Sequence, residues 1–326
     1  MESDGSAMDT HTERRDLFPE IAPFEHGEIA LDGPHKMYWE QSGNPEGAPV
    51  LFLHGGPGTG ATPAHRCFFD PAHYRIIIFD QRGAGRSKPL GETAGNTTEH
   101  LIADIEILRT RLGVERWLIF GGSWGATLAL AYGIRHPERC TGFVLRGVFL
   151  GRAAERDWFI HGMRTFFPEA WRAFSEFLPE DERGDLLGSY YARLTDSDPT
   201  VHGAAALAWS RYESACSKLA PGYDAPGNHA SGPALGLARL EAHYIKNRIF
   251  MPENYLLENI SRLHLLPGIV VQGRYDMICP IVTADELCCA WPNAELVVVQ
   301  DAGHSAMEPG IRSALVAATE AFKKPR

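Results

Sequence analysis

A serine in a glycine-rich turn is the residue of this sequence that is best suited to nucleophilic chemistry. Residues 121–125 read Gly-Gly-Ser-Trp-Gly, which places Ser123 at the centre of a G-x-S-x-G pattern between an apolar run at 117–120 and a helix-forming run at 126–132. A serine on a tight strand-to-helix turn exposes its hydroxyl as a nucleophile, and small neighbours avoid collisions there. A simple glycine-rich helix cap is the alternative that the pattern alone leaves open.

An aspartate and a histidine later in the chain are the partners that a nucleophilic serine needs. Asp276 follows a strand-like run at 269–272, and His304 follows another at 296–299. The order Ser123, Asp276, His304 is the nucleophile, acid and base order of the α/β-hydrolase architecture. In this interpretation His304 takes the serine proton and returns it to the leaving group, while Asp276 fixes the tautomer of the imidazole.

A second glycine-rich segment is a candidate for half of an oxyanion hole. Residues 54–58 read His-Gly-Gly-Pro-Gly and follow the first strong strand-like run, at 50–53. Acyl-transfer enzymes of this architecture use such a loop because glycines let backbone N–H groups approach the developing negative charge. We expect the N–H groups of Gly56 and Trp124 to bind the oxyanion. An ordinary Gly-Pro loop is the alternative.

The elements that must position these residues follow from the apolar pattern. The strand-like runs lie at 50–53, 75–79, 117–120, 143–145, 269–271 and 296–299. Their near-continuous apolar character is typical of parallel strands that are covered on both faces. Helical spacing at 101–112 predicts a crossover helix, and a terminal helix is expected at 309–322. The sequence therefore predicts an α/β-hydrolase fold with a mostly parallel central sheet and helices on both faces.

An insertion interrupts the strand pattern. From 151 to 250 the sequence is rich in aromatic residues and is broken by Pro and Gly. We interpret 151–250 as an all-helical cap domain with a loop at 221–232, and 17–150 with 251–326 as the catalytic domain. The polar residues 1–16 are expected to form a disordered or frayed N-terminal tail.

Composition argues against several other classes of protein. The 326 residues carry 31 Lys and Arg against 41 Asp and Glu, a formal charge of −10. The basic residues are scattered, which argues against a nucleic-acid partner. The apolar runs are only as long as strands, which argues against a membrane span. The six cysteines show no C-x-x-C spacing, so we expect reduced thiols in a cytoplasmic protein and no metal. A cationic ligand fits the acidic balance, and a homo-oligomer is compatible with the sequence.

Four motifs together make this chain resemble the proline iminopeptidases. They are the segments at 54–58 and 121–125, Asp-Gln-Arg-Gly-Ala-Gly-Arg-Ser at 80–87, and Gly-Arg-Tyr-Asp-Met at 273–277. The likeness extends from about Leu17 to Phe322. It implies a serine peptidase of the α/β-hydrolase fold, without a cofactor, that releases N-terminal proline from short peptides through an acyl-enzyme.

The resemblance also implies a substrate pocket inside the insertion. Glu213 and Glu241 match the glutamates that hold the charged amino terminus of the substrate, and Phe149 and Phe159 match aromatic walls of the proline pocket. Ile245 stands where the family usually has an aromatic residue. Two carboxylates in a closed site repel each other, which raises one pKa until a cation binds. Without the resemblance, the sequence around each glutamate favours a position on a solvated helix face over a role in substrate binding.

Two other functions remain as alternatives. A broad-specificity esterase or amidase would use the same triad but would accept acyl groups with a blocked amino terminus. A non-catalytic, ligand-binding relative would not react with a fluorophosphonate probe. Cys279 follows Asp276 by three residues, so we expect thiol reagents to obstruct the site through it, although Cys279 is not a nucleophile.

Overall fold

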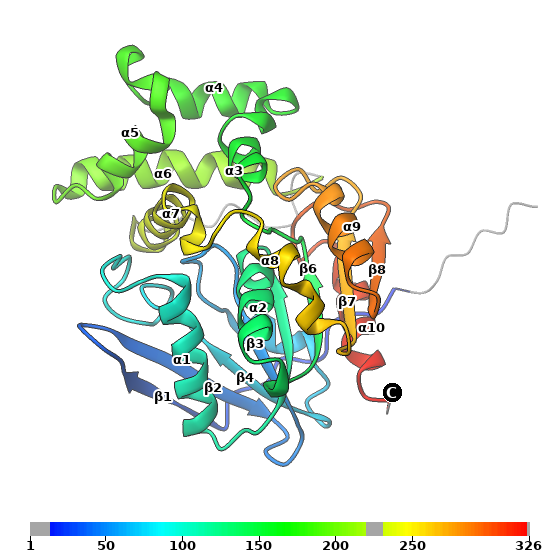
Figure 1. Cartoon of the computed structure of the whole chain (residues 1–326). Helices are drawn as coiled ribbons and strands as arrows, with labels where there is room; N and C mark the ends of the chain where they lie inside the picture. Colours follow the sequence, from blue (N-terminus) through cyan, green and yellow to red (C-terminus); the bar gives the residue numbers. More distant parts are fainter. Residues whose placement is uncertain (1–13, 220–230, 325–326) are drawn as a thin grey trace, which may run out of the picture.

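A single eight-stranded sheet forms the centre of the molecule (Figure 1). The computed structural model describes residues 14–219 and 231–324. In spatial order the strands are β1 (Glu25–Ala30), β2 (Lys36–Gly43), β4 (Tyr74–Phe79), β3 (Ala48–Leu53), β5 (Trp117–Gly122), β6 (Cys140–Arg146), β7 (Gly268–Gly273) and β8 (Ala294–Val299). Strand β2 is antiparallel to both of its neighbours, and the other neighbouring pairs are parallel. The predicted α/β-hydrolase fold with a mostly parallel sheet is confirmed.

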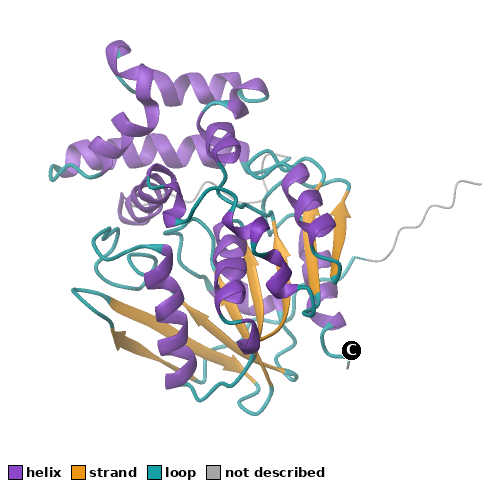
Figure 2. Ribbon diagram, viewed as in Figure 1, coloured by secondary structure: helices purple, strands orange, loops and turns teal. Residues whose placement is uncertain are grey.

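Helices cover both faces of the sheet, as Figure 2 shows. On strand β3, Leu51 and Leu53 belong to the core on one face of the sheet. The helices that cover this face are α1 (Thr98–Arg111), α2 (Trp124–Arg135), α8 (Tyr255–Glu258) and α9 (Ile281–Ala290). Val50 and Phe52 belong to the core on the opposite face, under α10 (Pro309–Ala321). Side chains alternate between faces along a strand, so a run with two covered faces is apolar throughout.

The first two strands were not predicted. The side chains of β1 are mostly exposed or half-buried, and β2 ends in the polar sequence Glu-Gln-Ser-Gly. Glu40 on β2 is nevertheless buried, because Arg66 forms an ion pair with its carboxylate at 2.7 Å. A search for apolar runs misses strands of this kind, since their polar groups are satisfied by partners distant in the sequence.

Five helices lie over the carboxyl ends of the parallel strands, in the upper part of Figure 1. They are α3 (Ala153–Ile160), α4 (Pro168–Glu176), α5 (Leu186–Leu194), α6 (Pro199–Cys216) and α7 (Ser231–Lys246). Aromatic side chains make much of their shared core: Phe174 stacks on Tyr190 and Tyr212, and Trp209 packs edge-on against Phe174. This layer therefore has a hydrophobic core separate from those on the two faces of the sheet.

Two boundaries differ from the sequence prediction. Most of the predicted loop at 221–232 lies outside the described residues, but Ser231 and Gly232 begin α7. Residues 14–16, which the prediction assigned to the tail, lie within the described chain, where the backbone N–H of Arg15 donates to Ser313 Oγ at 2.8 Å. Contacts with α10 order this segment. None of the helices within 14–219 and 231–324 has both the length and the apolar character needed to cross a membrane.

Candidate active site

The turn between β5 and α2 presents Ser123. The backbone of Ser123 has φ 58° and ψ −125°, a conformation that residues other than glycine rarely adopt. Close backbone packing holds the turn: a Cβ on Gly121 would lie 2.3 Å from the carbonyl oxygen of Gly125, and one on Gly125 would lie 2.1 Å from that of Leu53. Both glycines of the G-x-S-x-G pattern are therefore required sterically.

Asp276 and His304 form a buried, hydrogen-bonded pair. His304 Nδ1 lies 2.8 Å from Asp276 Oδ2, and the two residues are only 8% and 3% exposed. The carboxylate also accepts bonds from the backbone N–H of Cys279, at 2.8 Å, and from Gln272 Nε2, at 3.1 Å. Since a carboxylate only accepts, the His304 proton is on Nδ1 and the Nε2 lone pair is free to accept a bond.

Arg146, the last residue of β6, occupies the other side of the His304 ring. Its Nη1 donates to His304 Nε2 at 3.0 Å and to the His304 carbonyl oxygen at 2.9 Å. Within the described residues, no hydrogen bond joins the Ser123 hydroxyl to His304. The hydroxyl instead contacts the Cys279 thiol, whose pKa is raised by burial. The structure thus pairs Asp276 with His304 and leaves Ser123 outside that pair.

The remaining predicted site residues meet Ser123 in one pocket at the carboxyl ends of the strands. Its lining comprises Gly56, Pro57, Ser123, Trp124, Phe149, Phe159, Glu213, Glu241, Tyr244, Ile245, Ile249, Ile278 and Cys279. The sheet side supplies the serine and both residues of the expected oxyanion hole. Helices α6 and α7 supply the two glutamates. Residues distant in the sequence therefore come together in this pocket.

The two glutamates place a pair of interacting carboxyl groups in this pocket. Trp209 Nε1 donates to Glu241 Oε2 at 2.6 Å, and the Glu213 and Glu241 carboxyls are themselves hydrogen-bonded to each other. Burial raises the pKa of both groups, that of Glu213 to about 7. No Lys or Arg of the described chain pairs with either carboxyl. The pocket therefore holds negative charge, or a proton in its place, where a cation would bind.

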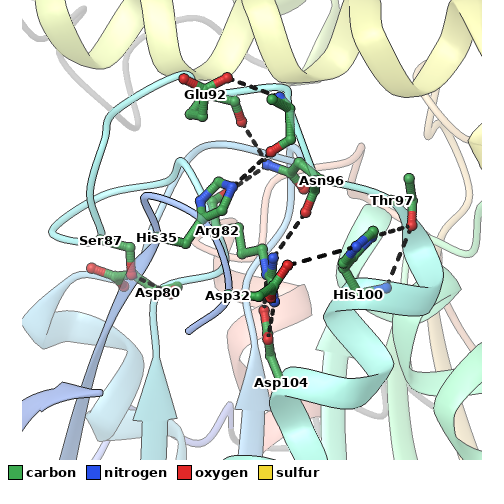
Figure 3. Close-up of polar contacts among 12 residues, drawn as sticks. Asp32, His35, Asp80, Arg82, Ser87, Glu92, Asn96, Thr97, His100 and Asp104 are labelled. Atoms are coloured by element: carbon green, nitrogen blue, oxygen red, sulfur yellow. Dashed lines mark hydrogen bonds and ion pairs between the residues drawn. The ribbon is translucent and has the colours of Figure 1, made fainter. Parts of the chain in front are cut away.

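Figure 3 shows hydrogen bonds and ion pairs formed by the loop after β4. Arg82 Nε donates to Asp104 of α1 at 2.6 Å, and Arg82 also pairs with Asp32. Asn96 Nδ2 donates to the Arg82 carbonyl oxygen at 3.0 Å. The hydroxyl of Tyr244 donates to Asn96 Oδ1 at 2.8 Å. Because Tyr244 belongs to α7, the network fixes that helix against the sheet.

Several residues of the site were missed by sequence reasoning. Arg146 gave no signal, because an arginine that ends a strand is ordinary. Gly147 packs against the imidazole: a Cβ on it would lie 2.9 Å from His304 Cε1, and its φ is +56°. Trp209 precedes Glu213 by four residues, so helical spacing places both on one face of α6 and could have identified it.

The side chains near the site also include the types that bind metal ions. Among residues 14–219 and 231–324, no three His, Cys, Asp or Glu side chains are grouped to hold an ion. The six cysteines are free, and Cys279 is the one that lines the pocket, as its position after Asp276 predicted. The described side chains can supply a nucleophile, a base and a cation-binding pair of carboxylates.

Comparisons with known proteins agree with this geometry. The family model described as alpha/beta hydrolase fold matches residues 48–310. A probable proline iminopeptidase from Leptolyngbya boryana is 49% identical, over 94% of this chain and 97% of its own length. The proline iminopeptidase of Arabidopsis thaliana is 47% identical, over 97% of this chain and 84% of its own.

Solved structures share the fold at lower identity. A proline iminopeptidase-related protein from Thermus thermophilus superposes with a TM-score of 0.56 at 24% identity, over 92% of this chain and 97% of that one. The full-length similarity to curated relatives decides the family. This chain belongs to the proline iminopeptidases, serine peptidases of the α/β-hydrolase fold.

Proposed function

We propose that this enzyme releases N-terminal proline from short peptides through an acyl-enzyme on Ser123. The observation that carries the proposal is the pair of hydrogen-bonded carboxyls, Glu213 and Glu241, in the same pocket as the serine. A nucleophile beside an unpaired anionic site fits a substrate whose positive charge is close to its scissile bond. A free N-terminal residue has that arrangement.

In the first step, Ser123 Oγ attacks the prolyl carbonyl carbon while His304 Nε2 accepts the serine proton. His304 must exchange its bond to Arg146 for one to Ser123 before this attack. The backbone N–H groups of Gly56 and Trp124 then bind the oxyanion, and each lowers the activation barrier by on the order of 3 kcal/mol. His304 returns the proton to the departing amine, and Asp276 stabilises the imidazolium meanwhile.

In the second step, water replaces the departed peptide. His304 accepts a proton from this water, whose oxygen attacks the prolyl ester carbon of Ser123. The tetrahedral intermediate collapses, the serine oxygen regains a proton from His304, and proline leaves. The same two N–H groups serve both steps, because each passes through an oxyanion at the same place.

Specificity arises from charge and shape. The substrate ammonium replaces the proton held between Glu213 and Glu241, so its positive charge stabilises two ionised carboxylates. Phe149, Phe159 and Ile245 offer apolar surface for the ring. We propose that helices α3 to α7, within the predicted cap at 151–250, form the barrier that excludes longer peptides. The free cysteines fit a reducing compartment, so the proposal places the enzyme in the cytoplasm.

Turnover of prolyl 4-nitroanilide by wild-type protein and by Ser123→Ala tests the proposal. We expect release of 4-nitroaniline by the wild type, none by the variant, and fluorophosphonate labelling of Ser123 only. A wild-type protein that is labelled but cleaves no prolyl substrate would favour the esterase alternative. A protein that is not labelled at all would favour a ligand-binding relative.

A further inference from the structure

Gln81 lies between the two loops that form the expected oxyanion hole. It follows β4 by two residues, and in the sheet β4 neighbours β3, which in turn neighbours β5. The turn after β3 contains Gly56, and the turn after β5 contains Ser123. The side chain of Gln81 is only 1% exposed, and it does not line the substrate pocket. Any effect on catalysis must therefore pass through other residues.

The side-chain amide of Gln81 joins both turns. Trp124 Nε1 donates to Gln81 Oε1 at 2.8 Å, and Gln81 Nε2 donates to the His54 carbonyl oxygen at 2.9 Å. The chemistry of the partners fixes the orientation of the amide, because an indole N–H can only donate and a carbonyl can only accept. Glutamine is the side chain that supplies an acceptor and a donor at this position.

The backbone of Gln81 controls the orientation of the first donor. Its N–H donates to His54 Nε2 at 2.9 Å, so the His54 proton lies on Nδ1, which donates to the Gly55 carbonyl oxygen at 2.9 Å. The Thr59 hydroxyl donates to the same oxygen at 2.7 Å. That oxygen and the Gly56 N–H belong to one planar peptide unit and point in opposite directions. Holding the Gly55 oxygen therefore aims the Gly56 N–H.

The second donor is fixed from its side chain. Trp124 is the first residue of α2, and its indole contacts both Gln81 and the ring of Tyr244, whose centroid is 4.5 Å away. The indole is 1% exposed, so it has no space to turn. The Trp124 backbone N–H is thereby held at a constant position relative to the turn that contains Gly56.

We propose that Gln81 is a positioning residue that holds the two N–H donors of the oxyanion hole, Gly56 and Trp124, at their catalytic separation. This inference rests on the proposed function, because it assigns those two groups to the oxyanion. Gln81 binds no part of the substrate. Its contribution appears only when negative charge develops on the carbonyl oxygen, since a ground-state carbonyl gains little from exact alignment.

Gln81→Met tests the proposal, because methionine has similar length but neither donor nor acceptor of comparable strength. We expect kcat for prolyl 4-nitroanilide to fall about tenfold to a hundredfold and KM to change less than about twofold. The inhibition constant of prolinal should rise in parallel with the loss of kcat. Ser123 adds to this aldehyde and places an oxyanion in the hole, whereas prolinol has no carbonyl and should bind unchanged.

A matched control comes from another buried glutamine. Gln41 on β2 is 2% exposed, donates to Glu25 at 2.6 Å and accepts from Arg75 at 2.6 Å. Gln41→Met should lower the melting temperature without changing kcat or prolinal binding. If Gln81→Met does not fold, Gln81→Glu replaces it: this side chain accepts from Trp124 but as a carboxylate cannot donate to His54, and the same selective loss is expected.

Each outcome decides a different claim. Wild-type protein without activity on prolyl 4-nitroanilide would contradict the proposed function and the inference with it. An active wild type whose folded Gln81 variant keeps its kcat and its prolinal affinity would overturn the inference alone. Equal losses for prolinal and prolinol would also overturn it, because they would show damage to the whole pocket.

Discussion

His304 Nε2 accepts a hydrogen bond from Arg146 Nη1, 3.0 Å away, at the atom that must receive the proton of Ser123. The same Nη1 is 2.9 Å from the His304 carbonyl oxygen, so the arginine can keep one contact when it gives up the other. The complete triad requires His304 Nε2 to leave Arg146 and bind Ser123 Oγ. We therefore infer that this geometry is a resting arrangement.

A complex with prolinal should show this exchange directly. We predict that His304 Nε2 lies within hydrogen-bond distance of Ser123 Oγ in the complex, while Arg146 retains its bond to the His304 carbonyl. A crystal structure of the hemiacetal measures both distances. The proposed resting arrangement fails if the imidazole remains on Arg146 in a complex whose serine is covalently modified.

Asp276→Asn should impair catalysis while leaving substrate binding intact. An asparagine can present its NH₂ group to His304 Nδ1, which favours the tautomer with its proton on Nε2 and removes the base. We expect kcat to fall about 10⁴-fold with little change in KM. Steady-state kinetics with prolyl 4-nitroanilide measure the effect. A reduction of less than about tenfold in a folded variant would contradict the role of Asp276.

Binding of the substrate cation should depend on pH through the two glutamates. The pKa of Glu213 is raised to about 7, so below that value Glu213 itself carries a proton that an incoming ammonium must displace. We predict that the inhibition constant of prolinol rises about tenfold between about pH 7.5 and pH 6.0. Glu213→Gln should flatten this dependence and weaken binding. A wild-type inhibition constant independent of pH would contradict the shared proton.

The same carboxyls should lower the stability of the unliganded enzyme in alkaline solution. Burial raises the folded-state pKa of Glu213 and Glu241, so folding favours their protonated forms. The contribution of Glu213 is complete below its unfolded pKa and is lost as the pH rises through about 7, and that of Glu241 is lost as the pH rises through its own raised pKa. Glu213→Gln should therefore raise the melting temperature more in alkaline than in acidic buffer. Glu176→Gln, at an exposed position, should give the same change in both buffers.

Thiol reagents should inactivate the enzyme through Cys279. This cysteine lines the pocket and contacts the Ser123 hydroxyl, and burial raises its pKa, so we expect slow reaction and complete loss of activity. Prolinol should protect it. Cys279→Ala should remain active after treatment, and modification of the exposed Cys289 should have no effect. Full activity of wild-type enzyme with Cys279 labelled would contradict this prediction.

The parallel sheet could be predicted from its apolar runs, and so could the places of Ser123, Asp276 and His304 after strands β5, β7 and β8. Strands β1 and β2 could not, because their polar residues are satisfied by distant partners such as Arg66. Glu213 and Glu241 depended on resemblance: helical spacing does not show that two helices bring their carboxyls together. Arg146 and Gln81 act through contacts between strand ends, which only the three-dimensional structure reveals.

Recognition of a free amino terminus by Glu213 and Glu241 is the central claim, and blocking that terminus tests it most directly. The measurement is kcat/KM for prolyl and for N-acetylprolyl 4-nitroanilide, with wild type and Glu241→Gln. We predict that acetylation lowers the wild-type value at least about a hundredfold, since it removes the charge that offsets two buried carboxylates. The variant should discriminate far less. Equal wild-type rates on the two substrates would contradict the claim and favour a broad-specificity amidase.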